Sequence, residues 1–164
     1  IDLLMPPFRG GEITFALTMG GLTRGFLVAI TVSISIYLFV PFTMHDPWLA
    51  LYFLVTSSIL LALLGCLAGI IAQSFDQMAA ITNYVITPLS FLSGTFYSIH
   101  YLPPFWQTIS HIDPFFYMID GFRYAITGYK DGNVELGIWV MFFSTLVMWL
   151  VVRALFIRGW RLKT

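Results

Sequence analysis

Charged residues are scarce in this sequence, and their scarcity excludes common classes of protein. They make up 10% of the 164 residues, whereas 59% of the residues are hydrophobic. Soluble domains carry charge at about a quarter of their positions, so this chain has too few charges to cover a water-exposed surface. Eight Lys and Arg residues balance eight Asp and Glu residues, which excludes the basic surface that nucleic-acid binding requires. The composition therefore indicates a membrane protein without a nucleic-acid partner.

Residues that carry catalytic or redox chemistry are also rare. The single cysteine, Cys66, can form neither an intrachain disulfide nor a cysteine metal cluster. No Walker-type glycine loop occurs, so the chain has no machinery of its own for ATP hydrolysis. The long apolar segments carry no Asp, Glu, Lys or His near their middles, although proton relays and ion-coupled carriers usually need one. We therefore expect no enzyme, and no metal or cofactor held by this chain.

Four apolar segments are long enough to cross a bilayer as helices. The hydrocarbon layer is about 30 Å thick, so a spanning helix needs about 20 apolar residues. Three of the segments carry no charge, and the fourth carries Glu135 and Arg153 near its two ends, where both can reach an interface. The expected fold is an all-α membrane protein whose four transmembrane helices cover residues 25–44, 47–75, 77–99 and 134–157.

The basic residues predict the orientation of these spans. Cytoplasmic flanks of membrane helices carry an excess of Lys and Arg, and four spans place both termini on one side. Arg123 and Lys130 are the basic residues on the other side. We therefore expect both termini to be cytoplasmic. The basic residues on the terminal side are Arg9, Arg24, Arg153, Arg158, Arg161 and Lys163.

The outer segment 100–133 is too apolar for an ordinary loop, yet its pieces are too short to cross. Asp113 followed by Pro114 is typical of a helix start, and Gly128 of a helix end, which predicts a helix over 114–127. A shorter helix over 104–110 would precede it, forming a re-entrant or interfacial helical hairpin. Asp120 and Arg123, three residues apart, are expected to pair. The expected apolar face comprises Phe115, Met118, Ile119, Phe122, Ala125 and Ile126.

The first 24 residues are less apolar than the four predicted spans. Pro6 and Pro7 break any helix there, and a helix is expected from Gly10, its start lying along the cytoplasmic surface before it enters the first span. Two pairs of glycines spaced by four residues, Gly21 with Gly25 and Gly65 with Gly69, are typical of close helix contacts. We interpret both pairs as packing within the chain.

The third span has two interruptions, Pro88 and Gly94, and several polar side chains. Such breaks either line a cavity or let a helix bend around its neighbours. The polar side chains suit the wall of a translocation path, although hydroxyl groups that pack helices together are at least as common. The candidate path residues are Asn83, Thr87, Ser90, Ser93 and Phe96.

Three histidines, His45, His100 and His111, fall on the predicted outer side, near Asp46 and Asp113. They raise the alternative of a membrane-embedded metal-dependent hydrolase or lipid-modifying enzyme. They lack a helical two-histidine motif, and their separations define no geometry. Interfacial or capping roles are the simpler interpretation, and a noncatalytic membrane scaffold is a third alternative.

The run ITPLSFLSGTFYSIHYLPPFWQTISHIDPFFYMIDGFRYAITG, residues 86–128, resembles the signature region of the ABC type-2 transporter permeases, the membrane subunits of bacterial ATP-driven exporters. The opening LLMPPFRGGEITFALTMGGLTRG, residues 3–25, is similar to the stretch that leaves the coupling helix of that family. Together the similar features extend over essentially the whole chain. The signature positions are Pro88, Ser93, Gly94, Phe96, Pro103, Pro104, Asp113, Pro114 and Arg123.

This resemblance implies one permease domain over 1–164 in a bacterial inner membrane. It implies a homodimer around a central route and a separate ATPase subunit that binds ATP and Mg. Asp2, Leu3 and Leu4 would belong to the coupling helix, and the hairpin with Asp113, Pro114, Asp120 and Arg123 would cap the exit. Family members usually have six spans, so we expect two N-terminal helices to be missing here, in agreement with a first residue that is Ile1 rather than Met. No signal-peptide pattern opens the chain. The cargo stays open among drug, lipid and polysaccharide.

Overall fold

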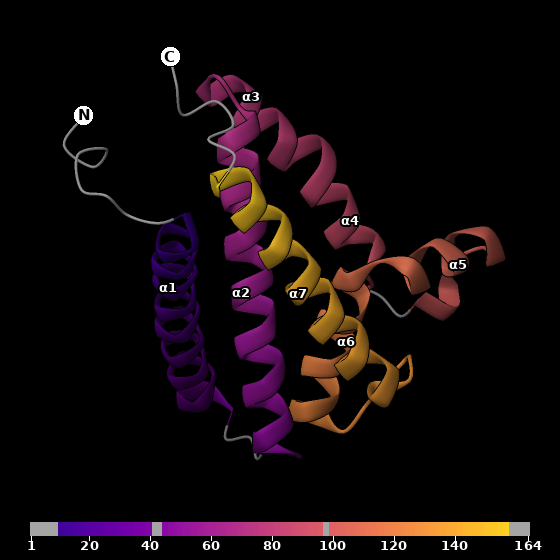
Figure 1. Cartoon of the computed structure of the whole chain (residues 1–164). Coiled ribbons are helices and arrows are strands. Elements are labelled where there is room, and N and C mark those ends of the chain that lie inside the picture. The colour runs from indigo at the N-terminus through magenta and orange to yellow at the C-terminus, as the bar shows by residue number, and fades with distance from the viewer. Residues whose placement is uncertain (1–9, 41–43, 97–98, 158–164) are drawn as a thin grey trace.

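The computed structural model describes residues 10–40, 44–96 and 99–157, and within these ranges all regular elements are helical. Three helices are long and apolar enough to cross a membrane: α1 (Gly10–Phe39), α2 (Pro47–Ile71) and α7 (Val134–Ile157). They pack side by side, with α2 against both α1 and α7 (Figure 1). An all-helical fold with three candidate membrane spans is therefore confirmed for the described residues, and the fourth expected span is not confirmed.

The ends of these helices differ in how closely they follow the expected spans. α7 covers the expected residues 134–157, and α2 starts at Pro47, where the Asp46 side chain accepts hydrogen bonds from two backbone N–H groups. α2 ends at Ile71 and α1 at Phe39, both earlier than expected. α1 also begins at Gly10 and continues without a break, so residues 10–24 and the first span form one helix.

The segment expected to be the third span is a succession of three short helical elements. α3 (Phe75–Ile81) leads into a π-helical turn, η2 (Thr82–Ile86), and then into α4 (Thr87–Leu92). The wide turn directly precedes Pro88, whose ring would clash with the carbonyl of an ordinary α-helical turn. The helix ends before residue 99 because Gly94 adopts the left-handed conformation, with φ of 78°.

The expected hairpin is present. It contains a short 3₁₀ turn, η3 (Ile99–Tyr101), followed by α5 (Pro104–Ile112) and α6 (Pro114–Thr127). Asp113 caps the start of α6 by accepting a hydrogen bond from the Phe115 N–H, and Gly128 ends it with φ of 75°. The caps proposed from the sequence are thus confirmed, and α6 lies beside α2 and α7 (Figure 1). We call this end of the bundle the hairpin end.

The core lies where α6 meets α2 and α7. Phe53 of α2, Phe116 of α6 and Met141 of α7 are almost fully buried there. A side chain at Gly121 would overlap the ring of Phe53, so α6 approaches α2 at that glycine. The hairpin is therefore a packed part of the bundle.

The two glycine pairs behave differently. Gly21 and Gly25 of α1 lie against Ala62 and Ser58 of α2, closely enough that any side chain would overlap these residues. This contact confirms the first pair as packing within the chain. A Cβ placed on Gly65 has no neighbour within 4 Å among the described side chains and neighbouring helices, so Gly65 does not make the close helix contact that its spacing from Gly69 indicated.

Candidate functional site

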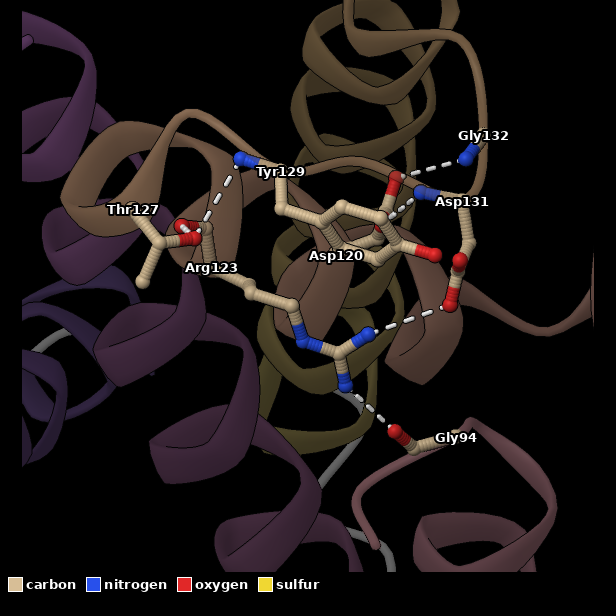
Figure 2. Close-up of polar contacts among 7 residues, drawn as sticks. All are labelled: Gly94, Asp120, Arg123, Thr127, Tyr129, Asp131 and Gly132. Atoms are coloured by element: carbon tan, nitrogen blue, oxygen red, sulfur yellow. Dashed lines mark hydrogen bonds and ion pairs between the residues drawn. The ribbon is translucent and has the colours of Figure 1, made fainter. Parts of the chain in front are cut away.

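A set of buried polar contacts joins the hairpin to the end of α4. The guanidinium of Arg123 donates one hydrogen bond to Asp131, at 3.1 Å, and another to the backbone carbonyl of Gly94 (Figure 2). The Asp131 side chain is 1% exposed and that of Arg123 is 25% exposed. One side chain of α6 therefore connects the end of α4 with the loop that leads into α7. We call Arg123, Asp131, Asp120 and Gly94 the hairpin clamp.

Asp120 does not pair with Arg123 as expected. Its two carboxylate oxygens accept hydrogen bonds from the backbone N–H groups of Asp131 and Gly132, at 2.7 and 2.9 Å (Figure 2). The residue is 3% exposed, because α6 turns this side toward the bundle. Asp120 thus holds the same loop that Arg123 binds, by a separate set of bonds.

The buried face of α6 consequently differs from the predicted apolar stripe. Phe115 and Ala125 are buried as expected, whereas the other members of that stripe are only partly buried. The helix is rotated so that Gly121, the residue closest to α2, lies at the centre of the contact. The buried residues of α6 are Phe115, Phe116, Tyr117, Asp120, Gly121 and Ala125.

A second polar contact lies beside the clamp. Ser93, 1% exposed, donates from its hydroxyl toward Asp113 Oδ2 at 2.9 Å and toward the Leu89 carbonyl at 2.6 Å. The Ser110 hydroxyl is 3.0 Å from the Leu92 carbonyl. These bonds attach the end of α4 to α5 and to the start of α6, and Ser93 is therefore buried.

The other candidate path residues lie on or near an exposed face of η2 and α4. Asn83 and Thr87 are exposed, Ser90 is partly buried, and Phe96 is 75% exposed. The hydroxyls of Thr87 and Ser90 donate to carbonyls of their own helix, at 3.0 and 2.9 Å. The Asn83 amide has no hydrogen bond within the part of the chain that the structure describes. We call Asn83, Thr87 and Ser90 the polar face.

Comparison with known proteins assigns this arrangement to a family. The profile described as "ABC-2 type transporter" matches residues 2–127, more than three quarters of the chain. The chain belongs to the ABC-2 type transporter family. This membership confirms the resemblance found in the signature region 86–128.

Two curated relatives are similar in sequence to this ABC-2 chain. The inner membrane transport permease YadH of Escherichia coli K12 is 36% identical over 163 residues, which cover 99% of this chain and 64% of YadH. Nodulation protein J of Rhizobium leguminosarum bv. viciae is 32% identical over 115 residues, 68% of this chain and 44% of that protein. The chain thus spans less than two thirds of either relative. No solved structure matches it.

His45 and His111 of this ABC-2 chain pack against different aromatic rings, and the side chain of His100 lies outside the described part of the structure. The His45 ring packs edge-on against Tyr124, and the His111 ring against Phe116, each with 5.3 Å between ring centroids. The described residues contain no group of three His, Cys, Asp or Glu side chains placed to hold a metal ion. The contacts of His45 and His111 are those of packing residues. The expected coupling residues Asp2, Leu3 and Leu4 lie outside the described residues.

Asp131 is the main member of the clamp that the sequence did not predict. It lies in the loop between α6 and α7, eight residues beyond Arg123, and no periodic pattern connects the two. The glycine that follows Asp131 was the available sequence signal. In the structure a side chain at Gly132 would meet Phe116 and Asp120. A glycine after an acidic residue in a short loop is compatible with such a close approach.

Asp113 yields a prediction about pH. Burial raises the pKa of its carboxyl, while hydrogen bonds from Phe115 and Ser93 oppose that shift. A carboxyl with a raised pKa stabilises the fold at low pH and loses this contribution as the pH rises through the raised pKa. The hydrogen bonds at Ser93 agree with a raised pKa of Asp113. The Ser93 hydroxyl has one proton for two acceptors, the Leu89 carbonyl and the Asp113 carboxyl, and a protonated Asp113 would supply a second proton. We expect Asp113→Asn to keep the fold and to weaken the loss of stability between pH 4 and neutral pH, measured as thermal unfolding against pH. A steeper loss in the variant would contradict this prediction.

Proposed function

We propose that this chain is the membrane-spanning permease part of an ATP-binding-cassette exporter. Family membership supports the proposal, as do three helices apolar enough to cross a membrane. In this proposal the continuous segment 75–92 is the fourth span, shorter than the others but about 27 Å long. A separate subunit binds ATP and Mg, and a second copy of the chain completes the route.

The observation that carries the proposal is the exposed polar face. In lipid, an amide without a partner is costly, so a polar side chain on a membrane helix faces protein or a water-filled cavity. Asn83 lies near the middle of segment 75–92 and is exposed in the single chain. A π-helical turn at the same place is typical of functional sites. We therefore place the substrate route along the polar face.

The arrangement of the helix ends supports a topology in which both ends of the chain lie on one side of the membrane. A Cβ on Gly10 would lie 2.9 Å from the backbone nitrogen of Ile157, so the start of α1 and the end of α7 lie at one end of the bundle. An even number of spans requires this placement. We propose that this end faces the cytoplasm of a bacterium, where Asp2, Leu3 and Leu4 contact the ATPase. The hairpin then lies at the outer surface and covers the exit.

Transport measurements test the polar face directly. The full-length protein and its copurifying ATPase are placed in inverted membrane vesicles, and ATP-dependent uptake is screened over drug, lipid and polysaccharide cargo. We expect Asn83→Leu to lower the uptake rate about tenfold, the effect of about 1.4 kcal/mol on a rate-limiting step. Asn83→Gln keeps the amide and should retain most of the activity, and Val85→Leu serves as the matched control on the same turn. Equal uptake by Asn83→Leu and the control would place the route elsewhere, and uptake that does not need ATP would reject the exporter itself.

A further inference from the structure

An apolar groove of about 320 Å³ lies between α1 and α7, and α2 completes its lining. The volume is in the range that holds small ligands. Three threonines contribute little polarity to it. The hydroxyls of Thr18 and Thr56 donate to carbonyls of their own helices, at 2.7 and 2.8 Å, and the Thr145 hydroxyl is buried. We call this feature the α1–α7 groove, and its apolar lining residues are Phe15, Met19, Ile59, Phe142, Leu146 and Trp149.

The α1–α7 groove opens onto the apolar surface of two helices that can cross a membrane. Phe15 of α1 and both Phe142 and Leu146 of α7 line it and are exposed. Hydrocarbon chains are the solvent along this surface. A wall without neighbouring atoms loses its dispersion contacts, and a flexible alkyl chain restores them. The groove therefore fits an acyl chain.

A positive charge lies at one end of this groove. The guanidinium of Arg153 is 5.2 Å from the ring centroid of Trp149, which itself lines the groove. Arg153 follows Trp149 by four residues and Leu146 by seven, so it continues the same face of α7. On the opposite wall, a Cβ added to Gly11, one turn before Phe15, would lie 3.7 Å from Arg153 Nε. The charge thus lies between the two walls, where α1 begins and α7 ends (Figure 1).

The Arg153 guanidinium makes no hydrogen bond or ion pair with residues 10–40, 44–96 or 99–157. It lies four residues before the end of α7 at Ile157, about 6 Å along the axis. A long basic side chain at this depth extends to the lipid headgroups. A headgroup phosphate offers the paired oxygen acceptors that a guanidinium binds best.

The flanking sequence adds charge of the same sign. The chain outside α1 and α7 carries four basic residues, whereas the acidic residues of the N-terminal stretch are Asp2 and Glu12. Clusters of Lys and Arg beside a membrane helix favour anionic over neutral lipids. The basic residues are Arg9, Arg158, Arg161 and Lys163.

We propose that the α1–α7 groove binds one acyl chain of an anionic phospholipid, whose phosphate is bound by Arg153. The site is separate from the polar face, because its lining residues come from α1, α2 and α7. The proposal requires that α1 and α7 cross a membrane, and it does not depend on which cargo is exported.

Native mass spectrometry of the full-length protein, purified from vesicles of phosphatidylglycerol and phosphatidylcholine, tests the charged end of the groove. Arg153→Gln should lower the retention of phosphatidylglycerol several-fold and change that of phosphatidylcholine little. Arg153→Lys should keep part of the retention, because lysine has the charge without the planar fork. Arg24→Gln is the matched charge control, since Arg24 is an exposed residue of α1 that does not line the groove.

The apolar wall is tested by a pair of neighbouring variants. Leu146→Trp fills the groove and should remove one retained phosphatidylglycerol per chain. Val147→Trp should keep that lipid, because Val147 is an exposed residue of α7 outside the groove. A photoactivatable side chain at position 146 should capture lipid.

Two outcomes would overturn the proposal. One is phosphatidylglycerol retention by Arg153→Gln equal to that of Arg24→Gln. The other is capture of polypeptide instead of lipid at position 146, which would assign the groove to another protein segment. Arg153 is exposed, so its variants test the site even if Leu146→Trp fails to fold. Lipid retention does not require ATP, so this proposal and the exporter proposal fail independently.

Discussion

Replacing Arg123 by alanine is expected to destabilise the protein by about 3 kcal/mol, the usual cost of removing one partner from a buried ion pair. The change removes the ion pair with a carboxylate that is 1% exposed and frees the Gly94 carbonyl at the end of α4. We expect the full-length protein in detergent to unfold at a lower temperature, and ATP-dependent uptake to fall with it because the hairpin loses its attachment to α4. Thermal unfolding and vesicle uptake measure the two effects.

The conservative variants separate charge from geometry at this position. Arg123→Lys keeps the positive charge but cannot donate to Asp131 and Gly94 with a planar fork, so it should rescue only part of the loss. In the double variant with Asp131→Asn, the cost should be smaller than the sum of the two single costs, because the two residues interact directly. Strict additivity would show that the ion pair contributes little. A full rescue by lysine would show that the bond to Gly94 contributes little.

Replacing Gly121 by alanine is expected to lower the free energy of unfolding by about 3 kcal/mol, at the upper end of the usual cost of overpacking a core. The added methyl group would overlap the ring of Phe53, which is 0% exposed and cannot move aside without displacing its neighbours. The expected result is a lower unfolding temperature together with less protein in the folded fraction. Size-exclusion chromatography of the detergent-solubilised protein measures that fraction.

Gly65 provides the matched control for this experiment. It is also a glycine inside a long apolar helix, but no described atom lies within 4 Å of the added Cβ. Gly65→Ala should therefore stabilise α2 slightly, by about 0.5–1 kcal/mol, because alanine loses less backbone freedom than glycine in a helix. Equal destabilisation by the two variants would contradict the close contact at Gly121.

Local signals predicted the boundaries of α6 and α7 well. Asp113, Pro114 and Gly128 mark α6 with a capping carboxylate, a fixed φ and a left-handed residue, and each acts over a few residues of chain. The apolar length of α7 is likewise a local property. Pro88 indicated an interruption, but the widened turn before it depends on how the surrounding backbone adapts, and the sequence pattern does not distinguish the possibilities.

The rotation of α6 and the partners of its charges could not be predicted in the same way. Asp120 and Arg123 have the spacing of a helical pair, yet packing of Gly121 against Phe53 turns Asp120 toward the loop. That orientation is decided by a contact between residues 68 positions apart. A signal was present, because a glycine in the middle of an apolar helix is typical of close helix approach. Centring the buried face on Gly121 would have placed Asp120 inside.

α1 is packed against α2 near Gly25 but is largely exposed beyond it, so its two halves differ in how tightly they are held. Fourteen residues separate Gly25, where α1 is held against Ser58, from the last residue of the helix at Phe39. At 1.5 Å per residue, this free arm is about 21 Å long. A tilt of about 10° about the contact at Gly25 would therefore move the far end of α1 by about 4 Å, so a small rotation at one end of the bundle would produce a larger displacement at the other.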